Sequence, residues 1–155
     1  MKLAGAVLFA VAALLALPAA AQTVSDMQIL ADKIRADKKL VVAANMQLSE
    51  DEAKGFWPVY DAYQKDLAGI NRRLLTVIKN YADAYNKGPV SDETAKKLLN
   101  QAIAVEEAEL KLKRSYVPRL EKVIPGTKVA RYIQIENKIR AVVKYELAAQ
   151  IPLVN

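Results

Sequence analysis

Apolar residues recur at steps of four and three over residues 56–85, and this spacing constrains the fold more than any other feature. The series is Phe56, Tyr60, Tyr63, Leu67, Ile70, Leu74, Val77, Tyr81 and Tyr85. Residues spaced in this way form one stripe on an α-helix, whereas side chains on a β-strand change face at every residue. No charged residue interrupts the stripe. The pattern predicts a long helix with one buried face.

Glycine and proline clusters at residues 86–89 and 125–127 divide the chain into further helices. The predicted helices cover residues 25–45, 49–85, 91–123 and 127–149. The second would be about 55 Å long at 1.5 Å per residue. The third has a wide apolar face, from Leu98 and Leu112 round to Ile103, which implies two packing neighbours. We expect an all-α fold: a long antiparallel, coiled-coil-like hairpin of the second and third helices, a shorter N-terminal helix, and a fourth helix packed back on the third.

Two of these helices begin with related sequences. Residues 48–52 read LSEDE and residues 90–94 read VSDET. In both, the serine oxygen can accept a hydrogen bond from a free N–H group of the first turn, and the acidic residues suit the positive end of the helix. Ser49 with Glu52 completes a capping box, whereas Ser91 with Thr94 does not.

The N-terminus has the form of a secretory signal peptide. Lys2 precedes an uncharged, mostly apolar run over residues 3–17, and an Ala-x-Ala site ends at Ala21. Cleavage there would leave residues 22–155 as a single helical domain. An uncleaved anchor is the alternative, although the run is short for a membrane span of roughly 20 residues. The form of the signal favours a periplasmic location. The chain has no cysteine and therefore no disulfide.

The chain is basic, with a formal net charge of +6 and 23 basic against 17 acidic residues. Outside the cytoplasm a basic protein meets little nucleic acid. Acidic unfolded segments, lipopolysaccharide phosphates and anionic membrane surfaces are the expected electrostatic partners. Solubility alone would also account for this charge.

Two prolines lie inside predicted helices. Antiparallel pairing about the Gly88–Pro89 turn would place Pro58 opposite Pro118. Each removes a backbone hydrogen bond and bends its helix, so two kinks at one level would let the hairpin curve as a unit. An aromatic cluster that includes Trp57, Tyr60 and Tyr116 falls at the same level. It could be a core cluster where the bend opens space, or a concave, partly exposed surface that grips apolar segments of another protein.

Charged residues interrupt the apolar faces of the third and fourth predicted helices. Pairing about the Pro125–Gly126 turn places Glu109 level with Arg140, and Lys113 level with Glu136. Two opposite-charge pairs across one interface would add little net stability, but they would penalise a slipped register.

Residue types that support catalysis are scarce. The chain has no histidine and no cysteine, so imidazole and thiolate metal ligands are absent. A carboxylate site for a hard cation at residues 106, 109 and 136 is the alternative, but Lys113 and Arg140 would neutralise it. Lys111 and Ser115 are spaced like a Ser–Lys dyad, a pairing that arises easily by chance on a helix. The sequence therefore favours a non-enzymatic protein without metal or cofactor.

With its repeated helix starts, the chain resembles the Spy/CpxP superfamily of periplasmic helical proteins, whose hallmark is a Leu-Thr-x-x-Gln motif that often occurs twice. Residues 48–52 match with Ser49 for Thr and Glu52 for Gln, and residues 90–94 match more loosely. The resemblance implies curved antiparallel dimers of helical hairpins. It also implies either an ATP-independent chaperone with a basic, partly apolar concave face, or restraint of an envelope-stress sensor kinase. A related branch senses heavy metals, mostly through His or Cys, which this chain lacks.

The expected function is the binding of unfolded or envelope proteins on a curved helical surface, by a homodimer. Trp57, Tyr60 and Tyr116 are the candidate apolar contacts, and Arg72 with Arg73 could steer acidic clients. The alternative is a structural or regulatory adaptor that docks on one envelope-stress or membrane partner.

Overall fold

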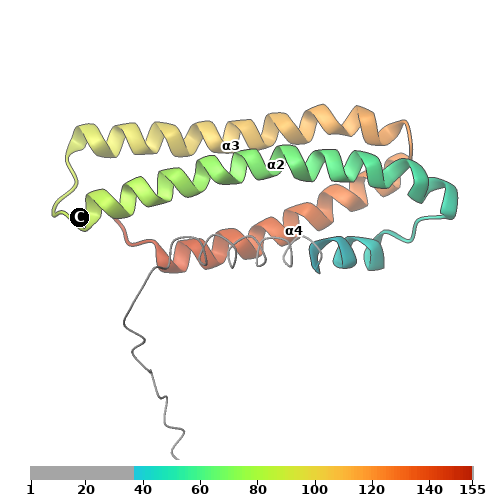
Figure 1. Cartoon of the computed structure of the whole chain (residues 1–155), viewed down its shortest axis with the longest axis horizontal. Helices are drawn as coiled ribbons and strands as arrows, with labels where there is room; N and C mark the ends of the chain where they lie inside the picture. Colours follow the sequence, from blue (N-terminus) through green and yellow to red (C-terminus); the bar gives the residue numbers. More distant parts are fainter. Residues whose placement is uncertain (1–36, 155) are drawn as a thin grey trace, which may run out of the picture. The chain divides into compact units, whose positions relative to one another are not determined.

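A computed structural model describes residues 37–154, which are helical apart from turns and a short tail. The helices are α2 (Glu50–Tyr85), α3 (Asp92–Glu121) and α4 (Gly126–Gln150), and residues 37–46 form a further helical segment (Figure 1). This confirms the predicted all-α class. The predicted signal peptide and most of the helix predicted over residues 25–45 lie outside the described residues. The compact unit that begins at Leu40 is described below.

The helix boundaries follow the predicted caps. Ser49 accepts a hydrogen bond from the Glu52 backbone N–H, and the Glu52 carboxylate accepts one from the Ser49 N–H at 2.8 Å, so the capping box is complete. At α3 the Ser91 hydroxyl accepts from the Thr94 N–H, without a reciprocal carboxylate. Both helices therefore begin where a serine satisfies a first-turn N–H group.

Helices α2 and α3 form the predicted antiparallel hairpin, packed side by side (Figure 1). Near its open end the backbone of Gly55 lies against Val123, and the rings of Tyr63 and Tyr116 meet edge to face with centroids 5.2 Å apart. This register places Pro58 level with about Leu120 rather than with Pro118. The two prolines, both inside helices, are thus offset by about two residues, or ~3 Å along the axis.

Helix α4 packs back on α3, as predicted, and also reaches α2 through long side chains. The ring of Tyr132 meets Phe56 at 5.2 Å and Tyr60 at 6.0 Å, and its hydroxyl accepts from Gln64. Val42 and Met46, from the helical segment before α2, are fully buried in the same core. The central core cluster comprises Val42, Met46, Phe56, Tyr60, Tyr63, Leu67, Tyr116, Leu120, Ile124, Val129 and Tyr132.

Large aromatic rings therefore fill the space between the helices near the open end of the hairpin. Toward the Gly88 turn, α4 runs obliquely away from the hairpin (Figure 1) and its exposed residues become frequent. Within residues 37–154, no helix combines the length and apolar character that crossing a membrane requires.

Candidate functional site

The aromatic cluster predicted as a binding surface is largely core. Tyr60 is 2% exposed and Tyr116 is 3% exposed. Trp57 is partly buried and packs edge-on against Phe56 and Tyr60, with centroids 5.0 and 5.3 Å away. The prediction that Tyr60 and Tyr116 grip a client is therefore wrong, because neither side chain is accessible. The alternative interpretation, a core cluster beside the prolines, describes these residues.

Buried hydroxyl groups accompany these rings. Tyr116 donates to Asp66 at 2.5 Å, and the guanidinium of Arg119 lies 4.2 Å from the Tyr116 ring centroid. Burial, followed by the negative charge of Glu136, raises the pKa of Tyr60, Tyr63 and Tyr132. These tyrosines are neutral at ordinary pH and act as structural groups.

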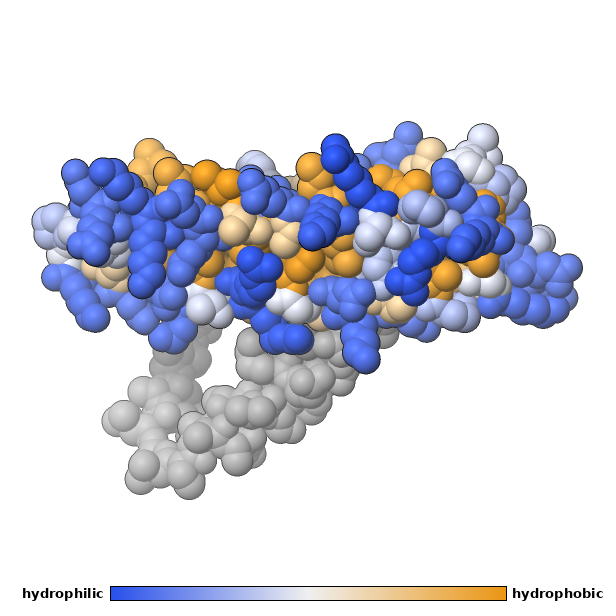
Figure 2. Space-filling model, turned by 90° about the horizontal axis from the view of Figure 1, so that it is seen from above, coloured by the Kyte–Doolittle hydropathy of each residue, from blue (hydrophilic) through white to orange (hydrophobic). Residues whose placement is uncertain are grey.

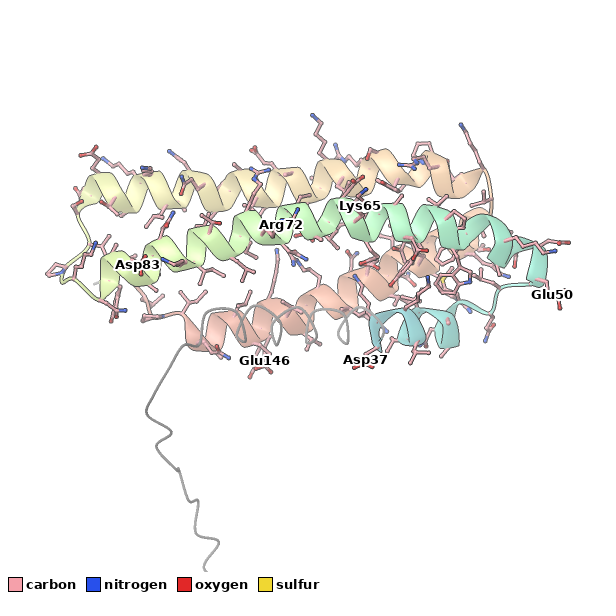
Figure 3. The ribbon with its side chains drawn as sticks, in the orientation of Figure 1. Asp37, Glu50, Lys65, Arg72, Asp83 and Glu146 are labelled. Atoms are coloured by element: carbon pink, nitrogen blue, oxygen red, sulfur yellow. The ribbon has the colours of Figure 1, made fainter. Side chains whose placement is uncertain are left out.

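The two arginines proposed to steer clients lie elsewhere. Arg72 and Arg73 are both exposed, and Figure 3 shows Arg72 near mid-length of α2. They lie about 23 Å along the helix axis from Trp57 at 1.5 Å per residue. The structure therefore does not bring these cations together with the aromatic residues into one site.

The predicted charge layer is present in part. Arg140 donates to one oxygen of Glu109 from Nε at 2.9 Å and from Nη2 at 2.6 Å, and its Nη1 donates to Asn71 at 2.9 Å. Lys113 donates to Asn137 at 2.9 Å and lies 3.8 Å from Glu109. Glu136 accepts from Gln64 at 2.8 Å. This polar layer thus links all three helices and includes three amides, Gln64, Asn71 and Asn137, that no sequence pattern singles out.

An exposed apolar stripe runs along the outer face of α3. Leu99, Ile103 and Leu110 are 59%, 44% and 51% exposed, at spacings of four and seven residues that place them on one face. Lys96 and Arg114, also exposed, extend this face at either end. Figure 2, viewed from the α3 side, shows hydrophobic surface between charged side chains. We refer to Leu99, Ile103 and Leu110 as the α3 stripe.

A cavity of about 510 Å³ opens between the hairpin and the C-terminal half of α4. Its walls are mainly leucine, valine and alanine side chains, and the tail after α4 closes one side. Charged residues gather toward mid-hairpin, where Lys144 donates to Glu106 at 3.2 Å beside the Glu109–Arg140 pair. The main lining residues are Leu74, Val77, Ile78, Tyr81, Ala95, Leu98, Leu99, Ala102, Val105, Leu147, Ala148, Ile151, Leu153 and Val154.

Residues 37–154 contain no group of three or more acidic side chains placed to hold a metal ion. No protein-family model matches the chain, and no curated protein or solved structure matches it.

The apolar face that the sequence predicts for α3 is wide enough to include the α3 stripe. The width of the α3 apolar face implied two packing neighbours, and α3 does contact both α2 and α4. However, the face is wider than those two contacts cover, so Leu99, Ile103 and Leu110 stay exposed. The cavity had no sequence signal, because it depends on where α4 departs from the hairpin.

Proposed function

We propose that this chain is a non-enzymatic binding protein of the cell envelope that holds apolar segments of unfolded or envelope proteins, in the manner of an ATP-independent chaperone. The observation that carries the proposal is the α3 stripe: three large apolar side chains, each at least 44% exposed, on one helix face. A run of exposed apolar side chains on one face is typical of a surface that binds other proteins.

The charge around this stripe supports the same function. Lys96 and Arg114 are exposed on the same face of α3, and the whole chain carries a net charge of +6. Cations beside an apolar strip favour segments that combine apolar and acidic residues, and they speed encounter at low salt. The resemblance of the helix starts to the Spy/CpxP superfamily points to the same class of protein and to a homodimer.

Aggregation of several unrelated denatured proteins provides the test. We expect the wild-type chain to suppress it broadly, and less at high salt because screening weakens the cationic contribution. Losing two buried apolar contacts from a bound segment costs about 1.5–3 kcal/mol each. The double variant Ile103→Gln, Leu110→Gln should therefore require at least ~10-fold more protein for equal suppression.

The matched control is Val142→Gln, which removes a large side chain that is 63% exposed on α4, outside the α3 stripe. It should suppress aggregation as well as the wild type. Equal loss in the control and in the double variant would show that the stripe is not the binding surface.

The alternative function is an adaptor for one envelope-stress or membrane partner. It predicts no suppression of unrelated proteins, together with capture of a single partner in stable complex. The double variant Ile103→Gln, Leu110→Gln separates the two functions further, since an adaptor would lose that one partner and nothing else.

A further inference from the structure

The cavity beside α4 has the dimensions of a ligand site. Its volume of about 510 Å³ lies within the roughly 300–1,000 Å³ usual for small-molecule pockets. Along α3 it extends from Ala95 to Glu109, about 21 Å at 1.5 Å per residue. One leaflet of a bilayer is roughly 15 Å of hydrocarbon, half of the ~30 Å core. The cavity is therefore long enough for one acyl chain of membrane length.

The chemistry of the lining restricts the ligand further. Apart from Glu106 and Glu109 of α3, the walls contributed by α2, α3 and the tail consist of apolar side chains and the ring of Tyr81, whose hydroxyl donates to the carbonyl of Pro152. The charged lining residues are engaged with one another, Arg140 with Glu109 and Lys144 with Glu106. An extended peptide would bring an N–H and a C=O group per residue into this space without partners, at a cost of about 1–3 kcal/mol for each. A hydrocarbon chain brings none.

The charged end offers a place for a head group. Lys144 is 52% exposed and its partner Glu106 is 67% exposed, so their ion pair contributes little and Lys144 can exchange Glu106 for another anion. The side chain of Arg140, by contrast, is only 16% exposed, and it remains paired with Glu109. An anion at the mouth would face Lys144 while its chain lies along Leu98 and Ala102.

We propose that this cavity binds a single hydrocarbon chain that carries an anionic head group, with the chain along α3 and the head group at Lys144. The site is separate from most of the α3 stripe, since Ile103 and Leu110 do not line it. The apolar tail residues Leu153 and Val154, 89% and 55% exposed, border the cavity and gain cover when a chain is bound.

The test is displacement of a fluorescent polyene fatty acid, below the micelle concentration, from the full mature chain. Hexadecanoate and a lysophospholipid with an anionic head should both displace the probe. The one that binds with the higher affinity shows whether the site prefers a carboxylate or a phosphate head group. Ala102→Phe and Ala148→Trp place bulk in the cavity from α3 and α4 and should each weaken binding at least tenfold. Ala141→Trp, an exposed position on α4 outside the cavity, is the matched control and should bind normally.

The head group is tested with Lys144→Gln, which should weaken hexadecanoate about two- to fivefold, as expected for an exposed ion pair, and leave neutral hexadecanol unchanged. The proposal is overturned if neither hexadecanoate nor the lysophospholipid displaces the probe. Unchanged binding in Ala148→Trp would also overturn it, and this variant serves as the test if Ala102→Phe does not fold. Displacement by an apolar peptide but not by hexadecanoate would also overturn it. Ala148→Trp should still suppress aggregation, so the two proposed functions can fail independently.

Discussion

Arg140 of α4 holds one carboxylate oxygen of Glu109 on α3 with two donors, at 2.9 and 2.6 Å, in a setting where the side chains are 16% and 9% exposed. Arg140 is additionally bonded to Asn71 of α2. The pair therefore fixes the position of α4 relative to both helices of the hairpin, at the inner end of the cavity.

Removal of one partner from this pair should be costly. Glu109→Ala leaves the largely buried Arg140 without its carboxylate partner, and we expect the free energy of unfolding to fall by about 3–5 kcal/mol. Urea unfolding followed by circular dichroism measures it. Glu106→Ala is the control, because the exposed pair of Glu106 with Lys144 should contribute no more than about 1 kcal/mol. Similar losses in both variants would mean that the Glu109 pair is not desolvated in solution.

Two glycines in α2 should respond oppositely to the same substitution. Each Gly→Ala change in a helix interior gains about 0.5–1 kcal/mol from backbone entropy. A Cβ at Gly69 has only ordinary contact, 3.8 Å from Arg72 Nη2, so Gly69→Ala should stabilise by this amount. A Cβ at Gly55 would lie 2.9 Å from the Val123 Cβ, so Gly55→Ala should destabilise by about 1–3 kcal/mol.

The thermal midpoints of the two alanine variants measure this contrast, and Val123→Ala in the Gly55→Ala background should recover part of the loss. A stabilising Gly55→Ala would contradict the close helix contact.

Alkaline pH should unfold the protein through its buried tyrosines. Burial raises the pKa of Tyr60, Tyr63 and Tyr132, so their stabilising contribution is complete below the unfolded value of about 10 and is lost as pH rises through the folded pKa. Each such group should make the free energy of unfolding fall by about 1.4 kcal/mol per pH unit above pH ~10.

Urea unfolding at a series of pH values measures this slope. Tyr63→Phe should reduce this slope measurably, since one of the tyrosines with a raised pKa is removed. Tyr145→Phe alters a ring that is 74% exposed and should leave it unchanged. A slope that is independent of Tyr63 would place that hydroxyl in contact with water.

At acid pH, Glu52 should carry part of the stability. The hydrogen bond from Lys128 at 2.5 Å, followed by the Ser49 N–H, holds the pKa of Glu52 below its usual value. The contribution of this carboxylate is present above its unfolded pKa of about 4.3 and is lost as pH falls through the lowered folded pKa.

Glu52→Gln keeps an amide that can complete the capping box, so it should mainly flatten the stability curve between about pH 5 and 2. Glu50→Gln, an exposed neighbour in the same first turn, is the control and should keep the wild-type curve. A Glu52→Gln curve identical to that of the wild type would exclude the contact with Lys128.

Local sequence rules were sufficient for the helices and their order. The four-and-three spacing in α2, the serine caps at Ser49 and Ser91, and the Gly88 turn act within a few residues, so their consequences could be predicted. The Glu109–Arg140 pair could also be predicted, because a short turn fixes which residues of α3 and α4 are level.

The candidate site depended on longer-range geometry. Periodicity identifies an apolar face but not how much of it a neighbour covers, and so it could not separate buried Tyr60 and Tyr116 from exposed Leu99 and Ile103. The prediction that Tyr60 and Tyr116 are accessible to a client was wrong for this reason. The cavity likewise depends on the oblique course of α4 away from the hairpin (Figure 1) and on the alanines at positions 95, 102 and 148. Their small side chains leave space of the kind that aromatic rings fill around Tyr132.

The sequence by itself determined that this chain is helical, that α2 and α3 begin after Ser49 and Ser91, and that Glu109 meets Arg140 across a turn, since hydrogen bonding and side-chain spacing within a helix are local. Only the tertiary structure decided which apolar side chains stay in water and where an open space remains. Burial is a property of several helices packed together, and one small change in the angle of α4 redistributes it among residues that look alike in sequence.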